Sequence, residues 1–172
     1  MEGGTGDMGE VIRRVCIGDE SVLAQIQTES WKAAFQNILS KEVLEKVTAV
    51  HQAESMYRRL LKEKIGNGYI LEINGAGHCI AWWDEARDLD CSGSAELICI
   101  HSLCDRWGHG YGRKMMEKVL ADIKAAGYAK VVLWTFEENG RARRFYEKLG
   151  FSADGKTKTS FGTQEIRYEK VL

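Results

Sequence analysis

Apolar and polar positions along the chain repeat with two periods, one typical of strands and one typical of helices. The segment 131–136 is apolar on both faces, which predicts a strand at 130–136 inside a sheet that is covered on both sides. From Lys114 the apolar residues form a one-sided stripe, which predicts an amphipathic helix that ends before Gly127. The other strands that we expect lie at 11–16, 69–73, 79–83, 96–100, 151–155 and 164–171, with a hairpin turn at 75–77. The other helices that we expect lie at 20–34 and 139–149, with one or two more between 40 and 64.

Length and composition favour one domain. A chain of 172 residues with 44% apolar content can bury an ordinary core, so we expect a flexible leader at 1–9 and a single domain at 10–172. A net charge of −1 gives no general attraction to nucleic acid or to an anionic membrane. No run resembles a membrane span or a signal peptide, so we expect no membrane partner and take the cytoplasm as the default location.

Three glycines, Gly108, Gly110 and Gly112, stand at alternate positions between a predicted strand and a predicted helix. Such a turn leaves backbone N–H groups unpaired at the helix N-terminus, and a diphosphate can approach them without meeting a Cβ atom. The spacing is not GxGxxG, because Arg113 stands where the third glycine would be, and the P-loop pattern is absent. The turn is therefore a candidate anion site, and an ordinary strand-to-helix connection is the alternative.

A second motif follows the strand 130–136. Its members are Asn139, Ala142, Phe145, Tyr146, Gly150 and Phe151. With the glycine turn, this motif makes the segment 96–151 resemble the acetyl-CoA core of the GNAT superfamily of N-acetyltransferases. The family's turn reads Arg/Gln-x-x-Gly-x-Gly/Ala; Gly110 and Gly112 match it, while Trp107 stands where Arg or Gln is usual.

The resemblance implies a mixed α/β fold with a twisted, mostly antiparallel sheet of about six to seven strands, flanked by about four helices and splayed between the fourth and fifth strands. It also implies an acetyl-CoA-dependent N-acetyltransferase, an acyltransferase that moves an acetyl group to a primary amine by direct attack in a ternary complex. Acetyl-CoA would be the cosubstrate, and no metal is implied. The acceptor stays open between a small-molecule amine and a peptide amino terminus, and a homodimer is one open assembly. A non-catalytic CoA-binding regulatory or sensory domain of the same fold is the alternative.

Roles for individual residues also follow from the resemblance. By its place in the motif, Tyr146 corresponds to the family's general acid, and its phenol keeps a proton at neutral pH; a packing role is the alternative. Glu96 aligns with a glutamate that some members use as a base, with His101 or water as alternatives. The residues expected to bind the cofactor are Ser102, Leu103, Gly108, His109, Gly110, Tyr111, Gly112, Arg113 and Asn139.

The acceptor site is expected in the parts of the chain that match the family least. Aromatic candidates for its walls are Trp31, Phe35, Trp82 and Trp83. Acidic residues that would attract a cationic amine are Asp84, Glu85, Asp88 and Asp90. Core packing of the tryptophans and a solvated acidic loop are the alternatives.

Overall fold

The structure is a computed structural model that describes residues 9–172, so the leader expected at 1–9 lies outside the described residues except for Gly9. The strands are β1 (Glu10–Arg14), β2 (Asn67–Ile73), β3 (Ala76–Glu85), β4 (Ala95–Ser102), β5 (Lys130–Phe136), β6 (Ser152–Ser160) and β7 (Thr163–Val171). The α-helices are α1 (Glu20–Phe35), α2 (Lys41–Val47), α3 (Val50–Glu63), α4 (Tyr111–Ala125) and α5 (Gly140–Lys148), and the 3-10 helices are η1 (Leu89–Cys91) and η2 (Cys104–Arg106).

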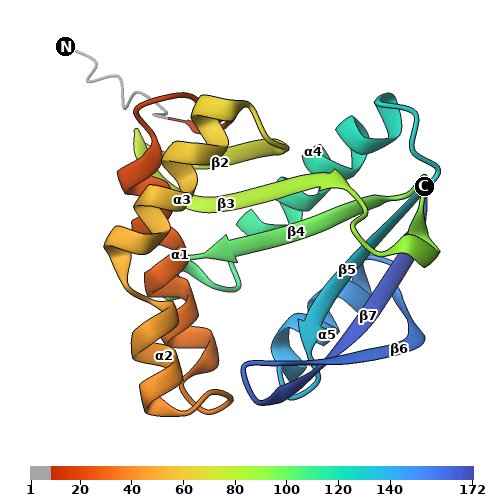
Figure 1. Cartoon of the computed structure of the whole chain (residues 1–172). Helices are drawn as coiled ribbons and strands as arrows, with labels where there is room; N and C mark the ends of the chain where they lie inside the picture. The colour runs from red at the N-terminus through yellow and green to blue at the C-terminus, as the bar shows by residue number, and fades with distance from the viewer. Residues whose placement is uncertain (1–8) are drawn as a thin grey trace.

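The strands form one seven-stranded sheet in the order β1-β2-β3-β4-β5-β7-β6. All neighbouring strands are antiparallel except β4 and β5, which are parallel and pair only at Ala95 with Val131 and at Glu96 with Val132. Beyond these pairs β4 and β5 diverge, as Figure 1 shows. The expected splay between the fourth and fifth strands is confirmed. It opens toward the ends of β4 and β5 that lead into the glycine turn and into α5.

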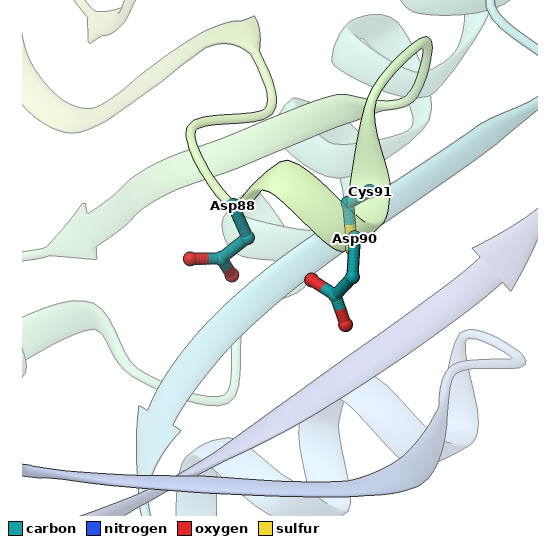
Figure 2. A group of neighbouring side chains, drawn as sticks. All are labelled: Asp88, Asp90 and Cys91. Atoms are coloured by element: carbon teal, nitrogen blue, oxygen red, sulfur yellow. The ribbon is translucent and has the colours of Figure 1, made fainter.

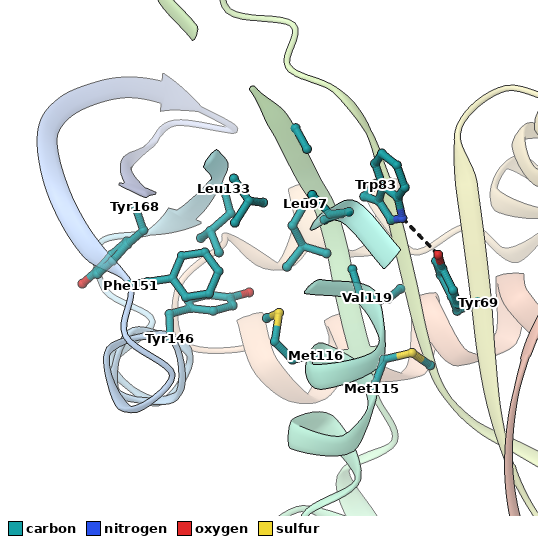
Figure 3. Close-up of a cluster of buried hydrophobic side chains, with 14 of the residues drawn as sticks. Tyr69, Trp83, Leu97, Met115, Met116, Val119, Leu133, Tyr146, Phe151 and Tyr168 are labelled. Carbon is teal, nitrogen blue, oxygen red and sulfur yellow. Dashed lines mark hydrogen bonds between the residues drawn. The ribbon is translucent and has the colours of Figure 1, made fainter. Parts of the chain in front are cut away.

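Helices cover both faces of the sheet, and each face has its own apolar core. On one face α1 and α3 pack on the sheet through side chains that include Leu23, Tyr57 and Trp82. On the other face α4 and α5 contribute Met116 and Tyr146, which lie in the cluster of Figure 3. This two-sided covering explains why the central strands are apolar at consecutive positions.

The neighbouring residues Trp82 and Trp83 point into opposite cores, because side chains alternate along a strand. Both are only 5% exposed. The indole of Trp83 donates a hydrogen bond to the hydroxyl of Tyr69 at 3.1 Å, drawn in Figure 3. Both tryptophans are therefore packed in the cores, as the alternative expected.

Several element boundaries differ from the sequence prediction for local reasons. α4 begins at Tyr111, before the apolar stripe that starts after Lys114, because Gly110 takes a φ of 84° and serves as the N-cap. The first hairpin turns at Asn74 and Gly75, with φ of 54° and 78°, instead of at 75–77. Five α-helices replace the expected four or so, since α2 and α3 are separate. Among the described residues, no helix is both long and apolar enough to cross a membrane.

Candidate active site

The glycine turn folds back on itself before α4 begins. Trp107 has a φ of −61° and a ψ of 144°, and Gly108 has a φ of 84°, values typical of the two central residues of a type II turn. Gly110 is again left-handed, and a Cβ built on Gly108 or Gly110 would meet no atom within 4 Å. The space beside both glycines is therefore open to a ligand.

The helix that follows supplies hydrogen-bond donors. Counting from the start of α4, the first backbone N–H that donates to a backbone carbonyl is that of Lys114, which bonds to Gly110 at 3.0 Å. Within residues 9–172 the N–H groups of Tyr111, Gly112 and Arg113 donate to no backbone acceptor. Three free donors at the positive end of a 15-residue helix are suited to an anion such as a diphosphate.

A cavity of about 430 Å³ lies between the glycine turn and α5, and we call it the turn cavity. Its lining includes Gly108, Gly110, Gly112 and Arg113 from the turn and α4, and Lys148 from the last turn of α5. The lining combines free N–H groups with cationic side chains, so the donor set fits the phosphates of coenzyme A.

A second cavity of about 170 Å³ lies where β4 and β5 diverge, and we call it the splay cavity. Its walls come from α1, β4, β5, the start of α5 and the β6–β7 hairpin. The two cavities share part of their lining, namely Ile100, Ser102, Trp107, Arg141, Ala142 and Tyr146. The turn cavity and the splay cavity therefore meet at the open end of the splayed strands.

Trp107 and Arg141 form a stacked pair at this junction. The guanidinium carbon of Arg141 lies 3.3 Å from the centre of the Trp107 ring, and the indole N–H donates to the carbonyl of Ser102 at 3.0 Å. The tryptophan that replaces the family's Arg or Gln thus ties the glycine turn to the end of β4. The stacking of Arg141 on Trp107 could not be predicted from the sequence, because it joins residues far apart in the chain.

Tyr146 lies on α5, and its ring packs near the aromatic rings of Phe151 and Tyr168, at centroid distances of 5.9 and 6.3 Å. Among the described residues its phenol has no hydrogen-bond partner, and it lines both cavities. Burial raises its pKa above the ordinary value of 10.0. The phenol therefore stays protonated at neutral pH, at the point where the two cavities meet.

Glu96 lies at the other end of β4, where this strand still pairs with β5. Arg87 binds its carboxylate through the guanidinium at 2.5 and 3.0 Å and through its backbone N–H at 3.2 Å. Glu96 lines neither the turn cavity nor the splay cavity. The structure therefore does not bring Glu96 to Tyr146, and the geometry gives no support to its predicted role as a base.

His101, the alternative base, lines the splay cavity. Its Nε2 accepts a hydrogen bond from the indole N–H of Trp31 at 3.1 Å, which places the ring proton of the neutral form on Nδ1. Burial lowers the pKa of His101 to about 4. The ring is thus neutral near pH 7, and the lone pair that would accept a proton is already bonded to Trp31.

The other predicted cofactor residues have mixed positions. Ser102 and Tyr111 line the turn cavity, whereas the N–H of Leu103 is bonded to the carbonyl of His78 at 3.1 Å. His109 stacks on Tyr111 with ring centroids 6.1 Å apart. Asn139 lines the splay cavity, and its side-chain oxygen caps α5 by accepting from the N–H of Ala142 at 3.1 Å.

Asp88, Asp90 and Cys91 form the group of metal-ligating atoms shown in Figure 2. The guanidinium of Arg167 donates to Asp90 at 2.8 Å and to Asp88 at 3.3 Å. Asp88 also accepts from the indole N–H of Trp134 at 2.9 Å, and burial raises the pKa of the Cys91 thiol. The group is thus organised around Arg167. Asp88 and Asp90, which were expected to attract an amine, hold a guanidinium of the chain itself.

Comparison with known proteins agrees with this geometry. The sequence model of the Acetyltransferase (GNAT) family matches residues 35–151, more than half of the chain. A Mycobacterium tuberculosis protein named as a probable N-acetyltransferase is 25% identical over 130 residues, which are 75% of this chain and 72% of that protein. N-alpha-acetyltransferase 40 of Saccharomyces cerevisiae is 39% identical over 62 residues, 32% of this chain and 22% of that protein.

Solved structures share the fold at low sequence identity. The PaiA N-acetyltransferase of Thermoplasma acidophilum, in complex with coenzyme A, has a TM-score of 0.79 and 18% identity, with 95% of this chain and 99% of that chain covered. The structure of yncA from Salmonella typhimurium with its cofactor acetyl-CoA has a TM-score of 0.70 and 17% identity. The match covers 95% of this chain and 94% of that chain.

The splayed mixed sheet, the turn with free N–H donors at its open end and these comparisons together identify an acyltransferase that uses acetyl-CoA. The chain belongs to the GNAT family of acetyltransferases. It is an acetyl-CoA-dependent N-acetyltransferase, and the activity, fold and family predicted from the sequence are confirmed.

Proposed function

We propose that acetyl transfer to a primary amine takes place where the turn cavity meets the splay cavity, with Tyr146 as the general acid. The observation that carries this proposal is the position of the Tyr146 phenol, which lines both cavities and has no hydrogen-bond partner among the described residues. A proton donor is useful there, because the sulfur of the cosubstrate and the amine must meet at one point.

In this proposal the turn cavity holds the diphosphate of acetyl-CoA. The N–H groups of Tyr111, Gly112 and Arg113 donate to it, and the open space beside Gly108 and Gly110 admits it. Lys148, which lines the same cavity, adds positive charge. A side chain at either open glycine would occupy the space that the phosphates need.

The pantetheine arm would run from the turn cavity into the gap between β4 and β5. β4 pairs with β5 only at Ala95 and Glu96, so the edge of β4 from 97 to 102 has no strand partner on that side. Free N–H and C=O groups on this edge are suited to the amides of the arm, and an N–H among them can polarise the thioester carbonyl. Trp107 and Arg141 line both cavities, so this stacked pair would either contact the pantetheine arm directly or move aside to let the arm pass.

The chemical step is a direct attack. The neutral amine forms a C–N bond to the acetyl carbon, the C–S bond breaks, and the departing sulfur receives the proton of the Tyr146 phenol. The nitrogen gives up a proton that restores the phenol. Glu96 and His101 are left out of this step, because Arg87 binds the first and Trp31 binds the second. We propose that residues 10–172 carry this activity as one domain.

The experiment that tests the proposal follows thiol release from acetyl-CoA over a panel of amines, together with calorimetry of acetyl-CoA binding. Turnover of at least one amine by the wild type, and its loss in Tyr146→Phe with binding retained, is the expected result. Binding of acetyl-CoA without turnover of any amine would instead favour a regulatory CoA-binding protein.

A further inference from the structure

The splay cavity carries a carboxylate that the sequence reasoning did not single out. We propose that the acceptor is a compact primary amine with an aromatic or branched aliphatic body, whose ammonium group binds Glu165. This inference rests on the proposed function, since it names the amine that enters the splay cavity.

Glu165 lies on β7, opposite Phe136 of β5, and lines the splay cavity together with Tyr146. Its side chain is only 17% exposed, and its nearest cation is Lys158 of β6, with the ion pair at 3.7 Å. In the described part of the chain no N–H or O–H group donates a hydrogen bond to its carboxylate. A covered carboxylate without a donor is unfavourable, and a ligand ammonium would supply the missing donors.

The other carboxylates near this part of the sheet are already bonded. Glu96 is held by Arg87, and Asp88 and Asp90 are held by Arg167. Glu165 pairs with Lys158 at 3.7 Å but accepts no hydrogen bond, and among the described residues it is the one carboxylate that lines the splay cavity.

Aromatic rings form the rest of the walls. Phe35 lies edge-on between Trp31 and Phe136, at centroid distances of 5.3 and 4.9 Å. Trp134 also lines the cavity, so rings from α1 and β5 surround the space beside Glu165. Such walls favour an apolar body and also attract an ammonium group through the ring faces.

Phe161, at the turn of the β6–β7 hairpin, reaches across to α1. Its ring lies 6.4 Å from that of Trp31, edge to face, so the hairpin and α1 meet over the cavity. An extended peptide would have to part this contact, whereas a compact amine fits beneath it. The cavity of about 170 Å³ is also smaller than the range of roughly 300–1,000 Å³ that is common for larger ligands.

A second positive charge on the substrate is disfavoured by the surroundings of Trp134. The Lys158 ammonium lies 4.2 Å and the Arg167 guanidinium 5.7 Å from the centre of that ring. Lys158 also lies beside Glu165, so one ammonium on this carboxylate already meets its charge, and the second ammonium of a polyamine would add to that repulsion. One charge and an apolar body are therefore the better match.

The proton balance of the reaction is consistent with this position. The bound ammonium releases one proton to solvent, and the free amine attacks the thioester. The nitrogen then loses a second proton to the phenolate of Tyr146, which has protonated the sulfur. The products are the amide, the thiol of coenzyme A and one proton.

The test measures kcat and KM for acetyl transfer to 2-phenylethylamine, isoamylamine, spermidine and a short peptide with a free amino terminus. We expect kcat/KM for the first two amines to exceed that for spermidine and for the peptide by tenfold or more. Phe161→Ala removes the contact with Trp31, and in this variant kcat/KM for the peptide should come closer to kcat/KM for the compact amines.

Glu165→Gln keeps the shape of the side chain and removes its charge. We expect KM for the preferred amine to rise by about 10- to 100-fold, as for loss of a charge-assisted hydrogen bond, with KM for acetyl-CoA unchanged. Glu165→Asp should restore part of the loss. The control is Glu169→Gln on the same strand, whose carboxylate pairs with Lys130 at 3.0 Å outside the cavity and whose loss should leave KM for the amine unchanged.

The outcomes separate this inference from the proposed function. Preference for spermidine or for the peptide, or an unchanged amine KM in Glu165→Gln, would overturn the inference while acetyl transfer itself stands. Binding of acetyl-CoA with no turnover of any amine on the panel would overturn both. A preference for the two compact amines that depends on Glu165 supports the inference.

Discussion

Replacing Tyr146 by phenylalanine removes one oxygen atom from the junction of the two cavities and leaves the ring in place. The residue is 8% exposed, and its ring packs against Phe151 and Tyr168. Because its hydroxyl has no hydrogen-bond partner in the described residues, the substitution leaves no protein group unsatisfied. We therefore expect the free energy of unfolding to change by less than about 1 kcal/mol.

The expected loss of kcat is on the order of 10², which corresponds to about 2.7 kcal/mol of transition-state free energy. This value lies at the low end of the range for general acid catalysis, about 10² to 10⁴. The reason is the leaving group: a thiol has a pKa of about 8.5, so its thiolate needs less help from an acid than an alkoxide would. Because burial raises the pKa of Tyr146, the wild type should also keep its acid through the mildly alkaline range.

The assay is steady-state thiol release with the preferred amine, combined with calorimetry of acetyl-CoA. The matched control is Tyr168→Phe: this hydroxyl donates to Glu147 at 2.7 Å and accepts from Arg143 at 3.1 Å, away from both cavities. The control should lose stability and keep its kcat. A Tyr146→Phe enzyme with the kcat of the wild type would refute the assignment of the general acid.

Four further predictions concern the turn, the stacked pair, and the two residues, Glu96 and His101, that the proposed step leaves out. Gly110→Val should weaken acetyl-CoA binding by tenfold or more in calorimetry, because φ is 84° and the open space would be filled. Trp107→Ala removes the hydrogen bond to Ser102 and should weaken acetyl-CoA binding. It should also reduce the change in tryptophan fluorescence when the protein is titrated with acetyl-CoA. Glu96→Gln should cost about 1–3 kcal/mol in urea unfolding and leave kcat unchanged. Below pH 6.5 His101 takes up a proton in the unfolded chain, whereas in the folded protein it does so only near pH 4, so the free energy of unfolding falls on acidification. Between pH 7 and 5 the free energy of unfolding of the wild type should fall by about 2 kcal/mol more than that of His101→Gln.

The central parts of the fold were predictable from local patterns. The strand expected at 130–136 has these bounds in the structure, because a segment apolar on both faces has one favourable place, inside a covered sheet. The apolar stripe after Lys114 located α4, but the stripe alone does not show that the left-handed Gly110 caps the helix. A one-sided stripe of apolar residues shows where a helix lies better than it shows where the helix begins and ends.

The site was predictable only where the chain itself brings residues together. The glycine turn and Tyr146 belong to motifs with fixed spacing, so their positions followed from the family pattern. The pairing of Glu96 with Arg87 depends on the path of the loop after β3, and the stacking of Arg141 on Trp107 depends on the angle between β4 and α5. Glu165 reaches the splay cavity through the register of β7 beside β5, which no local pattern reveals.

The central claim is that the turn aims the sulfur of the cosubstrate at the phenol of Tyr146. A crystal structure with coenzyme A tests it most directly. The account predicts the diphosphate on the N–H groups of Tyr111, Gly112 and Arg113, and the sulfur within hydrogen-bonding distance of the Tyr146 oxygen. A diphosphate bound elsewhere, or a sulfur beyond the reach of that oxygen with the turn occupied, would contradict it.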